Sequence, residues 1–106
     1  MNGYIIRTAY GNTYKTDENG YVLEYSNGLR EDRNSESRKT WQITGAWKYI
    51  GFGHIRTISL DELLKNNDKL ILTNGKPRYG TTDIDHGTRR LQGNKKYHGI
   101  VGISIY

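Results

Sequence analysis

The sequence predicts a β-rich α+β domain in which about six mostly antiparallel strands form a twisted sheet, with one short helix at about residues 60–66. A small, partly open β-barrel is the alternative arrangement of the same strands. Two observations favour this class: short segments of alternating polarity are separated by Gly and Asn-Gly turns, with 13 Gly and a single Pro, and one segment carries helix-capping residues. The length of 106 residues predicts a single domain over residues 1–106.

The first 28 residues predict a three-stranded antiparallel meander, with strands over residues 4–10, 13–16 and 21–25. Each of these segments alternates apolar and polar side chains, as a half-buried strand does. The Gly11-Asn12 pair predicts a two-residue type II′ turn. In the second turn, the Asn19-Gly20 pair is expected to supply the positive φ angles.

The middle of the chain predicts a loop followed by an aromatic strand. Residues 29–39 are charged and rich in Ser, with one apolar residue, and predict the largest mobile loop of the protein. The next segment alternates and predicts a long strand whose apolar face is made by Trp41, Ile43, Gly45, Trp47 and Tyr49. Because side chains six residues apart project from the same face of a strand, the two Trp are expected to be core and not an exposed stacking platform.

A short strand over residues 55–58 is predicted to lead into the helix. Ser59 fits the N-cap of a capping box, in which its hydroxyl accepts from the Glu62 amide and the Glu62 side chain reaches back. Asn66 and Asn67 are expected to end the helix after about two turns.

The C-terminal part predicts two more strands, over residues 69–73 and 97–106, on either side of a polar, glycine-punctuated stretch at 76–96. The last strand is expected to bury every second side chain. The predicted core consists of the apolar residues of these elements: Tyr4 or Ile5, Ile6, Val22, Trp41, Ile43, Trp47, Ile55, Ile58, Leu60, Leu63, Leu64, Ile71, Val101, Ile103 and Ile105.

Composition bounds the function. Sixteen Lys and Arg face eleven Asp and Glu, which gives a net charge of +5, and the mean hydropathy is -0.83. This balance favours an anionic partner, namely nucleic acid, a nucleoprotein or an acidic protein surface. The absence of Cys excludes disulfide scaffolds, Cys-based zinc sites and thiol catalysis. No segment resembles a signal peptide or a membrane helix, so we expect a cytoplasmic protein without a membrane partner.

Basic residues are concentrated in two segments. Residues 38–60 contain four basic residues and no acidic one, and residues 76–98 contain six basic and two acidic residues, so each segment carries +4 and the remainder carries -3. Aromatic residues are interleaved with these cations, a pattern typical of nucleic-acid binding because cations neutralise phosphates and rings stack on bases. Tyr79 and Tyr97 lie in polar surroundings and are expected to be exposed. The predicted binding residues are Arg38, Lys39, Arg78, Tyr79, Arg89, Arg90, Lys95, Lys96 and Tyr97.

The densest polar cluster lies at residues 83–90 and allows three interpretations. Asp83, Asp85 and His86 are the residue types of a divalent-cation site, but two carboxylates and one imidazole are too few ligands, so no metal is predicted. The cluster is otherwise a structured loop in which Asp85 orients His86 or binds Arg89, and the basic residues face an anionic partner.

The third interpretation is a small metal-independent ribonuclease. His86 with His54 or His98 would act as base and acid on the RNA 2′-hydroxyl and the leaving oxygen, and Arg89 or Lys96 would stabilise the phosphorane. The residue types are present, but no spacing between them is diagnostic of such a site.

We therefore expect a small basic binding protein that engages nucleic acid or a nucleoprotein and needs no small-molecule cofactor, with the ribonuclease as the alternative. A direct protein partner is compatible with the same charge. The Met-initiated, Cys-free, basic chain, rich in Tyr and Asn-Gly, is similar in style to small accessory proteins of phages and mobile elements, a class that includes inhibitors of host defence nucleases. That resemblance implies an inhibitor of a host nucleoprotein complex and implies no residue roles. Mimicry of DNA by an acidic face is disfavoured, because this chain is basic.

Overall fold

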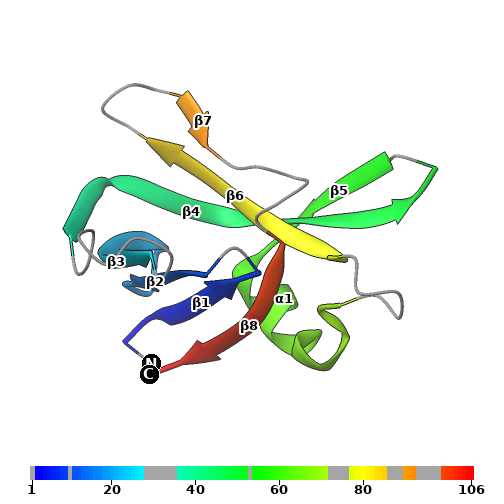
Figure 1. Cartoon of the computed structure of the whole chain (residues 1–106), viewed down its shortest axis with the longest axis horizontal. Helices are drawn as coiled ribbons and strands as arrows, with labels where there is room; N and C mark the ends of the chain where they lie inside the picture. Colours follow the sequence, from blue (N-terminus) through cyan, green and yellow to red (C-terminus); the bar gives the residue numbers. More distant parts are fainter. Residues whose placement is uncertain are drawn as a thin grey trace.

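The computed structural model of the protein describes residues 2–9, 11–27, 36–52, 54–71, 77–85, 90–92 and 99–106. Within these ranges the strands are β1 (Tyr4–Thr8), β2 (Asn12–Thr16), β3 (Tyr21–Asn27), β4 (Glu36–Gly51), β5 (His54–Ile58), β6 (Tyr79–Asp85), β7 (Arg90–Gln92) and β8 (Ile100–Ile105). The helices are α1 (Leu60–Lys65) and the 3-10 turn η1 (Asn67–Lys69). The predicted fold class is confirmed: antiparallel strands form a curled half-barrel, and one short helix packs beside it (Figure 1).

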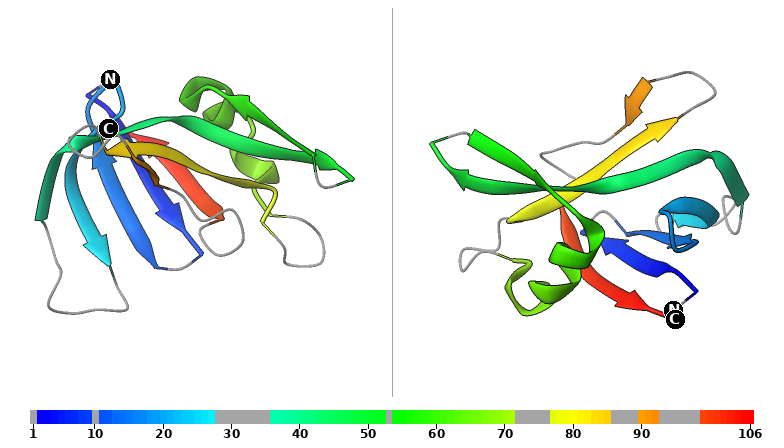
Figure 2. Two further views of the ribbon diagram at one scale, coloured as in Figure 1. Left: turned by 90° about the horizontal axis from the view of Figure 1, so that it is seen from above. Right: turned by 180° about the vertical axis from the view of Figure 1, so that it is seen from behind.

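One long strand, β4, organises the sheet, whose order is β7-β6-β4-β3-β2-β1-β8 with β5 added beside β4. Gln42 of β4 pairs with β3 on one edge and with β6 on the other, and Ala46 pairs with β5 and with β6. The strands β3 and β5 therefore follow one another along the same edge of β4. The β4–β5 hairpin consequently extends away from the rest of the sheet (Figure 2).

Both hairpins of the N-terminal meander have the same geometry. The Gly11 amide donates to the Thr8 carbonyl at 3.1 Å, and the Gly20 amide donates to the Asp17 carbonyl at 3.1 Å. Each glycine has a φ of +88° and is the left-handed residue that follows the turn. A turn followed by a left-handed residue is the usual form of a three-residue hairpin connection. The meander is confirmed, but the two-residue type II′ turn predicted at Gly11 and Asn12 is wrong, because Asn12 already belongs to β2.

The core fills the concave side of the half-barrel. Its fully buried side chains include Ile6, Val22, Ile43 and Leu63, which come from β1, β3, β4 and α1. The sheet curls far enough for Gly80 in β6 to form an isolated bridge with Gly99, just before β8. Ile58 and Leu60 anchor the end of β5 and the start of α1 to the same core.

The apolar face predicted for β4 is interrupted by a β-bulge. Ile43 pairs with Asp83 and Gly45 pairs with Thr82, so Thr44 is the extra residue. An extra residue reverses the alternation, and Ala46 joins Ile43 in the core cluster. Trp47, at 5% exposure, is buried outside that cluster. The prediction that Trp47 is buried is confirmed, whereas the prediction that it shares a face with Trp41 is wrong.

The Trp47 indole packs against Gly80 of β6. A Cβ atom added to Gly80 would stand 2.1 Å from the indole Cε2 and Nε1 atoms, so only a glycine leaves room for this ring. The buried Nε1 atom has no hydrogen-bond partner among the described residues. The packing against Gly80 is thus tight and apolar in character.

Trp41 takes part in an aromatic row on the concave side. Its ring meets that of Tyr25 edge-on at 6.0 Å between centroids, and Tyr25 lies 5.3 Å from Tyr14. Trp41 and Tyr25 are partly buried against the core, and Tyr14 is fully part of it. The Tyr25 hydroxyl donates to the buried Asn12 amide oxygen at 3.3 Å.

The helix forms as its caps predict. The Ser59 hydroxyl accepts from the Glu62 amide at 3.0 Å, and the Asn66 side chain donates to the Glu62 carbonyl at 2.7 Å. The capping box predicted that the Glu62 side chain reaches back to Ser59. In the structure the Glu62 carboxylate instead lies 3.5 Å from the guanidinium of Arg56 in β5. This ion pair ties the helix to β5.

Several predicted element boundaries are wrong. Residues 36–39, predicted as the end of a loop, begin β4, while the earlier part of that loop lies outside the described residues. Residues 69–71 do not form a strand, because η1 includes Lys69 and Leu70 caps it, and Ile71 makes only an isolated bridge with Pro77. The polar stretch at 76–96 contains two strands, β6 and β7. A ladder of backbone hydrogen bonds to β4 organises this polar sequence, which alternation alone did not reveal.

The predicted core is partly corrected in β8 and β5. Arg7 pairs with Gly102 and Thr8 with Ile100, so Val101 bulges out of the ladder and Ile100 takes its place in the core. The remaining residues predicted to be buried but found exposed are Ile55, Ile71 and Ile105. The core residues that the prediction omitted are Tyr14, Ala46, Leu70, Tyr79 and Ile100.

Tyr4 links the core to the helix and titrates abnormally. Burial raises the pKa of its phenol from 10.0 to about 12, helped by the hydrogen bond that it donates to the Asp61 carboxylate and by that negative charge. The native state thus holds this proton more tightly than the unfolded chain does. Stability should be unaffected by this group below pH 10 and should fall by roughly 2–3 kcal/mol as the pH rises from about 10 to about 12.

The measurement is the urea midpoint at a series of pH values between 8 and 12. Tyr4→Phe cannot ionise, and its exposed partner Asp61 can return to water. We expect the variant to lose less stability than the wild type over this range. Parallel curves for the two proteins would contradict the assignment of the alkaline transition to Tyr4.

Candidate nucleic-acid interface

The fold places the described strands of the two basic segments in one half of the sheet. Strands β4 and β5 come from the segment 38–60, except that β4 begins two residues earlier, at Glu36. Strands β6 and β7 come from the segment 76–98. Because β4 pairs with β5 on one edge and with β6 on the other, these four strands are continuous. We call them the basic half-sheet; they lie together in the upper part of Figure 1, above β1, β2, β3, β8 and α1.

Charge therefore differs between the two halves of the molecule. Strands β4, β5, β6 and β7 contain five basic and three acidic residues, a net charge of +2, whereas the other described residues contain five basic and six acidic residues, a net charge of -1. Lys76, Arg89, Lys95 and Lys96 of the second basic segment lie outside the described residues. The acidic residues of the remainder include Asp61 and Glu62 at the start of α1 and Glu24 in β3. A polyanion would be attracted to the basic half-sheet and repelled from the opposite half.

Three of the predicted binding residues are brought to one end of this surface. Trp41 pairs with Asp85, and Asp85 pairs with Arg90, so these residues form one row across β4, β6 and β7. Arg38 and Lys39 precede Trp41 in β4 by three and two residues. With a rise of roughly 3.3 Å per residue, both lie within about 10 Å of that row along the strand. The sequence separation of some fifty residues between Lys39 and Arg90 is thus removed by strand pairing.

Arg78 and Tyr79 lie at the other end of β6. Tyr79 pairs with Lys48, which is seven residues beyond Trp41 and hence roughly 20 Å further along β4. Tyr79 is 1% exposed, so the prediction that its ring is available for stacking on a base is wrong. The ring instead fills the core, with the Lys48 ammonium 5.8 Å from its centroid. The half-buried Arg78 uses its backbone to join β4 to Leu70.

The histidines of the ribonuclease alternative are only partly within the described residues. His54 is exposed and pairs with Gly51 at the tip of the β4–β5 hairpin. Asp85 pairs with Trp41, ten residues away from Gly51 along β4 and therefore on the order of 30 Å along the strand. His86, Arg89, Lys95, Lys96, Tyr97 and His98 lie outside the described residues. In the described part of the chain, no three His, Asp or Glu side chains are grouped as a metal site would need.

The distal β4–β5 hairpin forms a second exposed surface. The sequence predicted its strands but not that its apolar side chains are exposed. Four large apolar side chains are exposed there: Tyr49, Ile50, Phe52 and Ile55. Phe52, at 99% exposure, has a φ of +52°, a conformation that costs a residue with a Cβ atom about 1 kcal/mol. The signal in the sequence was an aromatic residue between two glycines at a hairpin tip, where Asn is the usual choice.

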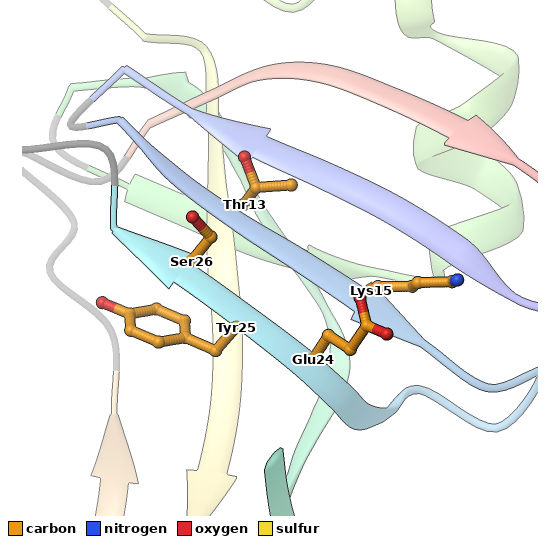
Figure 3. A pocket seen from close by; sticks show the side chains of 5 residues that line it. All are labelled: Thr13, Lys15, Glu24, Tyr25 and Ser26. Carbon is orange, nitrogen blue, oxygen red and sulfur yellow. The ribbon is translucent and has the colours of Figure 1, made fainter. Parts of the chain in front are cut away.

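One small hollow lies on the convex side of β2 and β3, lined by Thr13, Lys15, Glu24, Tyr25 and Ser26 (Figure 3). The Lys15 and Glu24 side chains extend in the same direction, while the Tyr25 ring points the opposite way. Its volume of about 60 Å³ has room for only about two water molecules. The hollow is therefore too small to bind a nucleotide or a cofactor.

No family model, curated protein or solved structure matches the chain. Within the described residues, no helix is long and apolar enough to cross a membrane, and α1 itself has six residues. The described surface offers cations that can neutralise phosphates and exposed apolar side chains on an extended hairpin.

Proposed function

We propose that the protein binds nucleic acid, free or within a nucleoprotein, through its basic half-sheet and performs no chemistry on it. The observation that carries the proposal is the pairing of β4 with β6 and of β6 with β7, which brings Arg38 and Lys39 of β4 and Arg90 of β7 to one end of the basic half-sheet. A nucleoprotein offers the same phosphates as free nucleic acid, so the proposal covers a partner such as a host defence complex.

The physical basis is the release of counterions. Each phosphate that a Lys or Arg neutralises releases condensed cations, and this entropy drives sequence-independent binding. The acidic remainder of the protein is repelled by the same phosphates, so one orientation of the protein is favoured. The row of Trp41, Asp85 and Arg90 places Arg38 and Lys39 near Arg90, at spacings within which a single nucleic-acid strand offers several phosphates.

The proposal predicts a steep salt dependence. Replacing the cations of the row, Arg38→Gln, Lys39→Gln and Arg90→Gln together, should weaken binding of a labelled oligonucleotide by about a hundredfold at low salt. It should also reduce the slope of log K against log salt by about 3, because one counterion-linked contact is lost per residue. Fluorescence anisotropy with single-stranded RNA, single-stranded DNA and duplex DNA over a salt series measures both quantities.

The matched control removes three cations from the other half of the molecule: Arg7→Gln, Lys15→Gln and Lys65→Gln. These positions lie in β1, β2 and α1, and the control lowers the net charge by the same amount. Its affinity and salt slope should stay close to those of the wild type. An equal loss in both triple variants would show that only net charge matters and would contradict the proposed surface.

The ribonuclease alternative makes a distinct prediction in the same assay. The wild type is incubated with labelled RNA in the presence of a chelator, beside His86→Ala. Binding without cleavage supports the proposal. Cleavage by the wild type that disappears in His86→Ala would replace binding by catalysis, since loss of a general acid or base costs about 10²–10⁴ in rate.

A further inference from the structure

The distal β4–β5 hairpin is an arm with two different faces. Lys48 pairs with Arg56, so the two cations share one face, and Tyr49 pairs with Ile55 on the other. Like charges directly opposite one another are unfavourable in a sheet. Arg56 is compensated by the Glu62 carboxylate at 3.5 Å, and Lys48 lies over the Tyr79 ring. One face of the arm thus carries two cations, of which Arg56 is ion-paired with Glu62, and the other face is apolar.

The tip of the arm presents one large apolar side chain to solvent. Phe52 connects the paired residues Gly51 and His54 and is 99% exposed. Its positive φ is a conformation that an Asn or Gly would adopt more readily. The Phe52 side chain buries almost none of its surface in the fold, so it contributes little to stability and is available to a partner.

The positive charge of the arm favours a partner that carries negative charge. No acidic residue occurs between Glu36 and Asp61, so the charged side chains that the arm itself supplies are the cations Lys48 and Arg56. Glu62 of α1 offsets part of this charge through its ion pair with Arg56. Duplex DNA accepts β-ribbons in its major or its minor groove, between two rows of phosphates. It also offers stacked base pairs between which proteins insert apolar wedges, Phe among them.

We propose that the arm enters the minor groove of duplex DNA, with Lys48 toward the phosphates and the Phe52 ring wedged between two base pairs. This inference rests on the proposed function and specifies its ligand as a duplex that the protein unstacks locally. Basic residues at the far end of β4 would hold the backbone of the same ligand, and Phe52 would deform it.

The test uses a set of duplexes in which one internal adenine at a time is replaced by 2-aminopurine, which is quenched when stacked and bright when unstacked. Wild-type protein should raise the emission at one or two adjacent positions. Phe52→Asn should abolish this rise and weaken duplex binding about tenfold or more, because the stacking contact is lost. Phe52→Trp, which keeps a flat apolar wedge, should retain both.

Phe52→Asn also serves as its own folding control, because Asn tolerates the φ of this position. Its melting temperature should equal or exceed that of the wild type. If the variant binds duplexes as tightly as the wild type and unstacks them equally, the arm inference is wrong and the proposed function stands. If wild-type protein binds no oligonucleotide, both are wrong. If Phe52 is instead needed for binding to phosphatidylserine vesicles and no duplex is unstacked, the arm is a membrane contact and the inference is overturned.

Discussion

Trp47→Ala should lower the free energy of unfolding by about 3–5 kcal/mol, the usual cost of truncating a buried Trp. The indole is 5% exposed and packs against Gly80, so the change would leave a cavity between β4 and β6. A domain of this size has about 5–15 kcal/mol of stability in total. The variant should therefore melt far below the wild type and be partly unfolded at 37 °C.

The measurement is urea denaturation followed by circular dichroism, which does not depend on the Trp that is removed. Trp47→Phe is the matched control, since it keeps an aromatic ring on Gly80 and removes the unpartnered Nε1 donor. We expect Trp47→Phe to be much less destabilising than Trp47→Ala. A fully stable Trp47→Ala protein would show that this ring is not part of the packing that holds β6 to β4.

Gly80→Ala should destabilise the protein by about 2–3 kcal/mol, although it adds a single methyl group. The new Cβ atom would lie 2.1 Å from two atoms of the indole, so either the ring or the strand must move. Gly80 also forms the bridge to Gly99, so a shift of β6 would loosen the closure of the half-barrel.

The double variant separates these two causes. If the clash with the ring is the main cost, Gly80→Ala should be nearly harmless in the Trp47→Ala background, because the methyl group then fills part of the cavity. The coupling energy in the double-mutant cycle should be about 1–3 kcal/mol and favourable. Additive effects of the two changes would instead indicate that Gly80 matters through its backbone.

Local patterns in the sequence were sufficient for the parts of the fold that local interactions decide. The N-terminal meander follows from alternation and from Gly at positions of positive φ, and α1 follows from the Ser59 cap and the Asn66 end. Alternation also predicted that Trp47 is buried, but it did not include the bulge at Thr44 and so placed Trp47 on the same face as Trp41. These features depend on residues within a few positions of one another.

The same local patterns could not predict the register between strands or the strands made of polar residues. The bulges at Thr44 and Val101 each reverse the alternation within a strand, and both arise from the partner strand and from the curl of the sheet. The strand β6 reads as a polar loop because its pairing with β4 supplies the stability that its own side chains do not. Tyr79 was misplaced for this reason.

Of the candidate site, the sequence predicted only the excess of basic residues in two segments. The two basic segments could be counted in the sequence, but their union on β4 and β6 required the pairing of residues about forty positions apart. The arm had no comparable signal. Its exposed side chains, such as Ile55, alternate like core residues, and only the position of β5 beyond the end of β3 leaves them uncovered.

The pairing of β1 with β8 has a consequence for synthesis on the ribosome. Tyr4 pairs with Ile105 and Ile6 with Ile103, so β1 leaves the ribosome long before β8, the strand that completes its ladder. Until then β1 is an edge strand with exposed amides and carbonyls, the kind of edge that pairs with other chains. Contacts of such long sequence separation also slow folding, because their loop must close before they contribute. The nascent protein should therefore be most prone to aggregate after the meander has formed and before residues 100–105 are released.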